Sequence, residues 1–117
     1  MSNVTSNVTA RTAIIVYVTA SSDAEAKHIA DALITEQLAA CCNICPGIRS
    51  IYMWEGKLCD EKEVLLLIKS FEDCFEALAK KIKSLHSYKV PEIIAVPLTK
   101  GDEAYLRWME EVVPSKP

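Results

Sequence analysis

The sequence predicts a single α+β domain in which two helices cover one face of a four-stranded antiparallel sheet. Three observations support this fold class: apolar, β-branched segments of strand length, segments with apolar residues at helical spacing, and their order, β-α-β-β-α-β. At 117 residues, the chain is long enough for one hydrophobic core and too short for several domains. We expect residues 1–11 to be a disordered lead-in, residues 12–113 to form the domain and residues 114–117 to be a loose tail.

The first strand and the first helix come directly after the lead-in. Thr12–Thr19 (TAIIVYVT) is β-branched and nearly all apolar, which is typical of a strand buried on both faces. Ser21, Ser22 and Asp23 then offer helix N-caps. The next segment, Ala24–Leu38, has the pattern of an amphipathic helix. Its apolar stripe consists of Ala26, Ile29, Ala30, Leu33, Ile34 and Leu38.

The middle of the chain predicts a long hairpin. Cys41–Cys45 has the pattern of a short strand that Pro46-Gly47 stops, and Ile48–Glu55 has that of a second strand. Gly56-Lys57 is a turn candidate, and Glu61–Ser70 is the returning strand. At ~3.4 Å per residue the two long strands span about 25–35 Å, more than two helices of roughly four turns cover. We therefore expect this hairpin to project from the domain and to need a partner.

The second half of the chain supplies the remaining elements. Ser70 is a candidate cap for a second helix, with Asp73 in a capping-box-like position. The buried face of this helix is predicted to contain Phe75, Leu78, Ala79, Ile82 and Leu85. Pro91 keeps the helix from continuing, and Glu92–Pro97 is the fourth strand. Gly101-Asp102 begins a short C-terminal helix whose inward-facing residues are Tyr105, Leu106, Met109 and Val113. The complete order is that of the ferredoxin-like fold.

Composition excludes several classes of function. A net charge of -3 leaves no electrostatic footprint for nucleic acid and no basic face for a membrane surface. No apolar run approaches the roughly 20 residues that span a bilayer, and the polar start of the chain does not resemble a signal peptide. The number of cysteines, five, is odd, which argues against a disulfide scaffold. We therefore expect a reducing, cytoplasmic environment.

Three long blocks of the chain match one known family. LAACCNICPGIRSIYMWEGK, EVLLLIKS and LHSYKVPEIIAVP closely resemble the CutA divalent-cation tolerance family, and the resemblance extends over Ala13–Met109. It implies a ferredoxin-like fold and a homotrimer in which long central strands pair between subunits. It also implies binding of copper and tolerance of copper and other divalent cations.

The cysteines can be separated by strand geometry. Side chains alternate along a strand, so Cys42 and Cys45 point to opposite faces and cannot chelate one ion together. We interpret both as small buried hydrophobic residues. Cys41 occupies the cysteine of the family's LAAC motif, and the resemblance implies that its thiol binds copper. Cys59 and Cys74 match no motif of the family.

His86 is the second candidate metal ligand, because it occupies the histidine of the family's HPYxVPE block, here HSYKVPE. Imidazole suits copper and zinc alike. The alternative is a histidine that interacts with the free carbonyls at a helix C-terminus. Ser87 stands where the family usually has proline, which loosens the turn that places His86. Glu61 or Glu92 could complete a mixed oxygen and nitrogen site with His86.

Four further residues are candidates for a ligand-binding cleft. The resemblance places Lys69, Tyr88, Trp54 and Glu63 near a cleft between neighbouring subunits. The alternatives are a solvated strand end for Glu61 and Glu63 and an ordinary salt bridge between Lys69 and Glu92. For Tyr52, Trp54 and Trp108 the alternative is that they anchor a subunit interface.

Two functions follow from these residues. The first is a homotrimeric cytoplasmic protein that binds copper or another divalent cation and has further copies of itself and metal ions as its partners. The second is a trimeric signalling module, like the PII-type regulators, that binds a small ligand or anion at subunit clefts. The sequence shows no catalytic triad, no phosphate-binding loop and no recognisable carboxylate pair, so we do not expect an enzyme.

Overall fold

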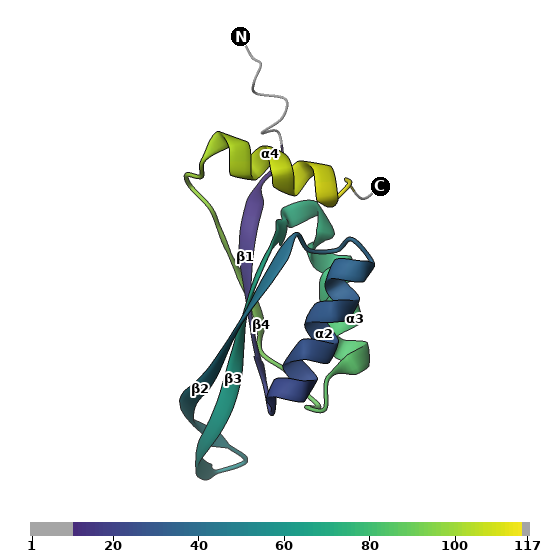
Figure 1. Cartoon of the computed structure of the whole chain (residues 1–117). Coiled ribbons are helices and arrows are strands. Elements are labelled where there is room, and N and C mark those ends of the chain that lie inside the picture. Colours follow the sequence, from purple (N-terminus) through teal and green to yellow (C-terminus); the bar gives the residue numbers. More distant parts are fainter. Residues whose placement is uncertain (1–10, 116–117) are drawn as a thin grey trace.

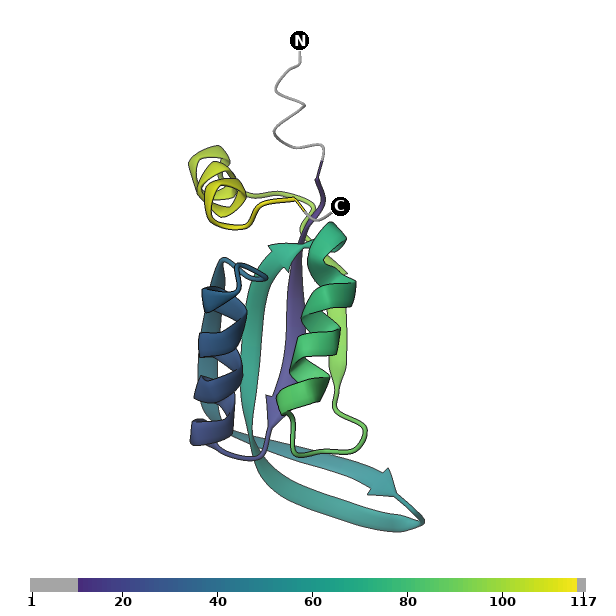
Figure 2. The same cartoon turned by 90° about the vertical axis from the view of Figure 1, so that its right-hand side faces the viewer.

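The computed structural model describes residues 11–115 and shows the predicted arrangement (Figure 1). The elements in chain order are β1 (Ala13–Ala20), α2 (Asp23–Thr35), β2 (Cys41–Trp54), β3 (Lys57–Phe71), the 3-10 turn η2 (Glu72–Cys74), α3 (Phe75–Leu85), β4 (Ile93–Pro97) and α4 (Glu103–Val112). The strands form one antiparallel sheet in the order β2-β3-β1-β4. Helices α2 and α3 lie side by side on one face, α4 crosses one end, and the β2–β3 hairpin extends past the other end (Figure 2). The ferredoxin-like prediction is confirmed.

The main core lies between the sheet and the helix pair. Val16 and Val18 of β1 are fully buried, as are Leu66 and Ile68 of β3. The helices contribute Ile29, Leu33, Leu78 and Ile82, which are fully buried as well. Ser22 is the N-cap of α2, and its hydroxyl accepts a hydrogen bond from the backbone N–H of Glu25 at 3.1 Å. The cap thus fixes the start of the helix, and the apolar stripe fixes the face that it buries.

A smaller core joins α4 to the end of the sheet. Met109 and Val113 are fully buried against Phe71 and Cys74. Of the four residues expected to face inward from this helix, Tyr105 is an exception, because its side chain is exposed.

Arg11 contacts several segments at this end of the molecule, so it belongs to the folded domain rather than to the expected lead-in. Its guanidinium donates two hydrogen bonds of 2.8 Å to Asp73, donates one of 2.6 Å to the carbonyl of Val113 and lies 3.9 Å above the ring of Phe71. The rest of the lead-in, residues 1–10, and residues 116–117 of the tail lie outside the described residues.

The structure corrects three local expectations. Strand β2 does not stop at Pro46-Gly47, because a bulge between Cys45 and Ile48 takes up the proline, which has no N–H to donate to the ladder. Strand β3 begins at Lys57 rather than at Glu61. Ser70 is a residue of β3 whose hydroxyl donates to the carbonyl of Leu38 at 2.6 Å, and it does not cap a helix. The hairpin is therefore longer than the sequence indicates.

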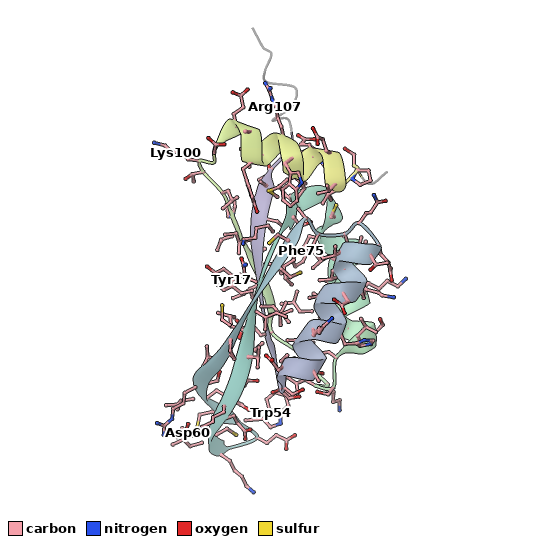
Figure 3. All side chains as sticks on the ribbon, in the orientation of Figure 1. Tyr17, Trp54, Asp60, Phe75, Lys100 and Arg107 are labelled. Carbon is pink, nitrogen blue, oxygen red and sulfur yellow. The ribbon has the colours of Figure 1, made fainter. Side chains whose placement is uncertain are left out.

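The face of the sheet opposite the helices is also apolar. Directly paired residues of an antiparallel ladder share a face, so Ile94 and Val96 of β4 lie on the same side as Tyr17 and Ile15 of β1. We call this surface the open face; its large apolar residues are Ile15, Tyr17, Leu65, Leu67, Ile94 and Val96. Figure 3 shows Tyr17 on the side away from α2. Ile94 is 56% exposed and Val96 44%, which leaves apolar surface uncovered in one chain.

No helix within residues 11–115 is long and apolar enough to cross a membrane.

Candidate functional site

A groove lies where the projecting hairpin leaves the rest of the sheet. Its volume is about 680 Å³. The hairpin provides one wall and the segment between α3 and β4 provides the other. Its lining includes Thr19, Ser50, Tyr52, Trp54, Glu63, Tyr88 and Glu92. Trp54 lies at the hairpin end of the sheet (Figure 3). Four of the eight residues that the sequence singles out, Trp54, Glu63, Tyr88 and Glu92, therefore line one groove.

Glu63 is the buried charged residue of this groove. It is only 6% exposed, and the hydroxyl of Tyr88 donates a hydrogen bond of 2.5 Å to its Oε2 atom. Burial and the neighbouring Glu63 carboxylate raise the pKa of Tyr88 above its usual value. The pKa of Tyr52 is raised as well, by desolvation and then by the charges of Cys59, Glu61 and Glu63. For Glu63, the alternative of a solvated strand end is wrong because the residue is buried.

His86 lies at the C-terminus of α3, but its ring bonds the carbonyl of Thr19 in β1 rather than the free carbonyls of that helix, which the alternative interpretation expects. Its side chain is fully buried. The Nε2 atom donates to the carbonyl of Thr19 at 2.7 Å, and Nδ1 accepts from the backbone N–H of Tyr88 at 3.0 Å. Because the Tyr88 N–H can only donate, we assign the neutral tautomer with its proton on Nε2. Neither ring nitrogen has a lone pair left for a metal ion in this arrangement.

Glu25 supports the segment that carries His86. Its carboxylate accepts hydrogen bonds from the backbone N–H and hydroxyl of Ser21, at 2.9 and 2.8 Å, and from the backbone N–H of Ser87 at 2.6 Å. Burial alone would raise the pKa of Glu25, but these hydrogen bonds outweigh it and lower the pKa to about 2. No sequence pattern points to Glu25 beyond its place in the first turn of a helix. Its role depends on a loop 62 residues away.

Cys41 lies near the other end of the sheet, next to Lys69. The two residues are directly opposite each other on β2 and β3, and Lys69 Nζ lies 4.0 Å from Cys41 Sγ. Lys69 also donates to the side-chain carbonyl of Asn43. No ion pair joins Lys69 to Glu92 within the described range, and Lys69 does not line the groove. The predicted salt bridge is therefore wrong.

The remaining cysteines follow the strand geometry. Cys42 packs against the main core, and burial raises the pKa of its thiol to about 12. Cys45 pairs with Leu65 on the opposite face of the sheet, which agrees with the expected alternation. Cys74 is fully buried in the smaller core, and all five cysteines are free thiols.

The four candidate metal ligands are not gathered in one place within a single chain. Cys41 lies beside Lys69, and His86 is buried under the loop that ends α3. Glu61 pairs with Ser50 in the projecting hairpin, and Glu92 lines the groove. Residues 11–115 contain no group of three or more histidine, cysteine, aspartate or glutamate side chains that could hold a metal ion. Any site that uses several of these residues needs ligands from a second chain or a rearrangement.

Comparison with known proteins gives one consistent result. Residues 14–112 match the family model described as CutA1 divalent ion tolerance protein. The chain is 45% identical over 97 residues to the divalent-cation tolerance protein CutA of Thermus thermophilus, covering 83% of this chain and 94% of that protein. It is 46% identical over 97 residues to the chloroplastic protein CutA 1 of Oryza sativa, of which it spans 55% of the length.

A solved structure agrees with these sequence matches. The crystal structure of CutA1 from Oryza sativa superposes with a TM-score of 0.87 at 43% identity. The superposition covers 90% of this chain and 96% of that structure.

Proposed function

Because this chain belongs to the CutA1 divalent ion tolerance protein family, we propose that it acts as a cytoplasmic homotrimer that binds copper or another divalent cation. The observation that carries the proposal is the family match over residues 14–112, which includes the groove and the Cys41 region. The family description names ion tolerance and no reaction, and the proposal contains no catalytic step.

The donor set fits a divalent cation in part. Glu61 and Glu92 form no ion pair within residues 11–115, so their oxygens are free to bind a hard or borderline cation. Cys41 offers a soft sulfur donor, which suits copper. His86 fits only if its Nδ1 atom gives up the hydrogen bond that it accepts from the backbone N–H of Tyr88. We propose that Cys41, Glu61 and Glu92 act as ligands in the assembled protein, with His86 as a residue that becomes available on rearrangement.

Assembly is supported by the surface that one chain leaves uncovered. The open face exposes Ile94 and Val96, and the hairpin exposes Ile51, Met53 and Leu58 at 62%, 64% and 72%. Exposed apolar surface of this kind favours contact with another copy of the chain. That the assembly contains three chains is taken from the family resemblance.

The five free thiols agree with a reducing compartment, and on that basis we propose the cytoplasm.

Calorimetric titration of the chelator-treated protein with Cu²⁺ tests the metal proposal. We expect saturable binding that weakens at least about tenfold in the double variant Cys41→Ala, Glu92→Gln, because each change removes one donor atom. Cys59→Ala is the matched control, since Cys59 is also a partly exposed thiol of the same sheet. Copper binding that keeps its affinity in the double variant, and after Cys41→Ala with His86→Gln, would contradict the assigned ligands. Circular dichroism confirms that each variant is folded.

The groove supports a small organic ligand, one of the two kinds of ligand in the alternative function, and opposes the other, an anion. Its volume suits a small organic ligand, which agrees with a ligand-binding module. Its charges oppose an anion, because three carboxylates, Glu55, Glu63 and Glu92, line it against one lysine, Lys89.

A further inference from the structure

The groove contains a buried carboxylate that lacks a positively charged partner. Glu63 is 94% buried, and its only side-chain partner within residues 11–115 is the neutral hydroxyl of Tyr88, which donates to Oε2. No lysine, arginine or histidine in that range forms an ion pair with it. A buried charge is costly unless an opposite charge or several hydrogen bonds compensate it. Glu63 lines the groove, so a cation that enters the groove would compensate this carboxylate.

The surrounding charges favour the same sign of ligand. Glu55 and Glu92 also line the groove, and Lys89 is the one basic side chain among the lining residues. Desolvation is the main cause of the raised pKa values of Tyr52 and Tyr88, and the carboxylate of Glu63 raises both further. An anion would meet repulsion from three carboxylates, whereas a cation would be attracted.

The walls of the groove indicate which kind of cation fits. Tyr52, Trp54 and Tyr88 line it together, and 48% of Trp54 and 40% of Tyr52 remain exposed. Aromatic faces attract ammonium groups and also contact the methyl or methylene groups attached to them. A bare metal ion instead needs several converging donor atoms, and no such group is present within residues 11–115. A volume of about 680 Å³ accommodates a small organic molecule.

We propose that this groove binds the ammonium group of a small organic amine. Glu63 faces the positive charge, Trp54 and Tyr52 contact the carbon atoms around the nitrogen, and Glu92 adds a second carboxylate at the groove wall. The residues all come from one chain, and Glu92 is the residue that this groove shares with the proposed metal site.

A fluorescence titration tests the proposal with tetramethylammonium chloride as the probe. The chain has two tryptophans, so the Trp108→Phe variant leaves Trp54 as the single reporter in the groove. In EDTA and at constant ionic strength, we expect tetramethylammonium to change the Trp54 emission saturably. The uncharged molecule of the same shape, tert-butanol, and sodium acetate should produce no saturable change.

Two substitutions in the same background locate the binding. Glu63→Gln keeps an acceptor for Tyr88 and removes the charge, and we expect it to weaken tetramethylammonium binding about tenfold. Glu76→Gln, on an exposed site of α3, is the matched control and should leave the affinity unchanged. Equal responses to tetramethylammonium and tert-butanol, saturation by acetate, or unchanged affinity in Glu63→Gln would each overturn the inference. Glu63 is not among the proposed metal ligands, so a Glu63→Gln variant that binds Cu²⁺ normally separates the loss of amine binding from the loss of the metal site.

Discussion

Glu25 and His86 connect segments that lie far apart in the sequence, and each does so through hydrogen bonds of a buried polar group. Glu25 accepts from Ser21 at the start of α2 and from Ser87 after α3, while His86 links Thr19 to Tyr88. Tyr88 continues to Glu63 in the groove. The polar residues below the groove therefore hold its loop in place, which gives His86 a structural explanation that needs no metal.

The acid dependence of stability tests the role of Glu25. Its pKa in the folded protein, about 2, is lower than the ordinary value of 4.5, so the carboxylate stabilises the fold fully above pH 4.5. This stabilisation is lost as the pH falls from 4.5 towards 2. We expect Glu25→Gln to lower the free energy of unfolding by about 2 kcal/mol at pH 7, with a smaller difference at pH 3. Thermal denaturation of the unchanged protein and of Glu25→Gln between pH 7 and pH 3 measures this difference in stability.

The control for this measurement is Glu76→Gln, which removes an exposed carboxylate of α3. It should leave the unfolding temperature nearly unchanged at every pH. A Glu25→Gln difference that stays constant from pH 7 to pH 3 would show that the charge of Glu25 is not what stabilises the loop.

Residue patterns predicted part of this site and not the rest. Alternation along β2 correctly separates Cys42 from Cys45, because strand periodicity is a local property. The hydrogen bonds of His86 depend on Thr19, which is 67 residues away, so no local pattern contains them. Glu63 has the sequence context of a solvated strand end, whereas in the fold it is buried and bonded to Tyr88, which is 25 residues away.

At the scale of elements, the β2–β3 hairpin shows how turn chemistry extends a strand. Trp54 pairs with Lys57, so the connection is a two-residue loop, Glu55-Gly56. Both loop residues have positive φ, 50° and 79°, which is the backbone of a type I′ turn and matches the twist of a hairpin. Glycine adopts this conformation freely, whereas glutamate does so at a cost.

Replacing Glu55 tests this turn. Asparagine tolerates the left-handed conformation better than glutamate, so we expect Glu55→Asn to raise the free energy of unfolding by about 0.5–1 kcal/mol. Glu61→Asn is the control, because it makes the same exchange within a strand, where asparagine is unfavourable. Urea denaturation compares the two variants. Equal effects would mean that the turn does not limit the stability of the hairpin.

The same hairpin shows why element boundaries were predicted less well than element types. Pro46-Gly47 predicts the end of a strand. The chain instead forms a bulge there, with Gly47 at a φ of 82°, and the pairing with β3 resumes at Ile48. Proline blocks a ladder hydrogen bond only where its nitrogen faces a partner, and a bulge removes that requirement. Sequence alone does not say which of these outcomes occurs, because β3 supplies the partner that keeps β2 extended.

At the scale of the whole molecule, the helices cover one face of the sheet and leave the open face apolar. Strand β4 contributes Ile94, which is 56% exposed in one chain. If three copies bury this face, a charge at Ile94 would have to be buried without a partner, which is strongly unfavourable. Ile34 is a matched isoleucine on the helical side, 41% exposed on α2. The same substitution at the two sites therefore separates the open face from the helical face.

Light scattering at micromolar concentration measures the mass of each protein and hence its number of subunits. We expect the unchanged protein and Ile34→Asp to have the mass of a trimer and Ile94→Asp to have the mass of one chain, 13.0 kDa. The dissociated variant should also unfold at a lower temperature, because assembly stabilises each folded chain by mass action. A monomer mass for the unchanged protein would contradict the assembly, and a trimer that persists in Ile94→Asp would place its interface away from the open face.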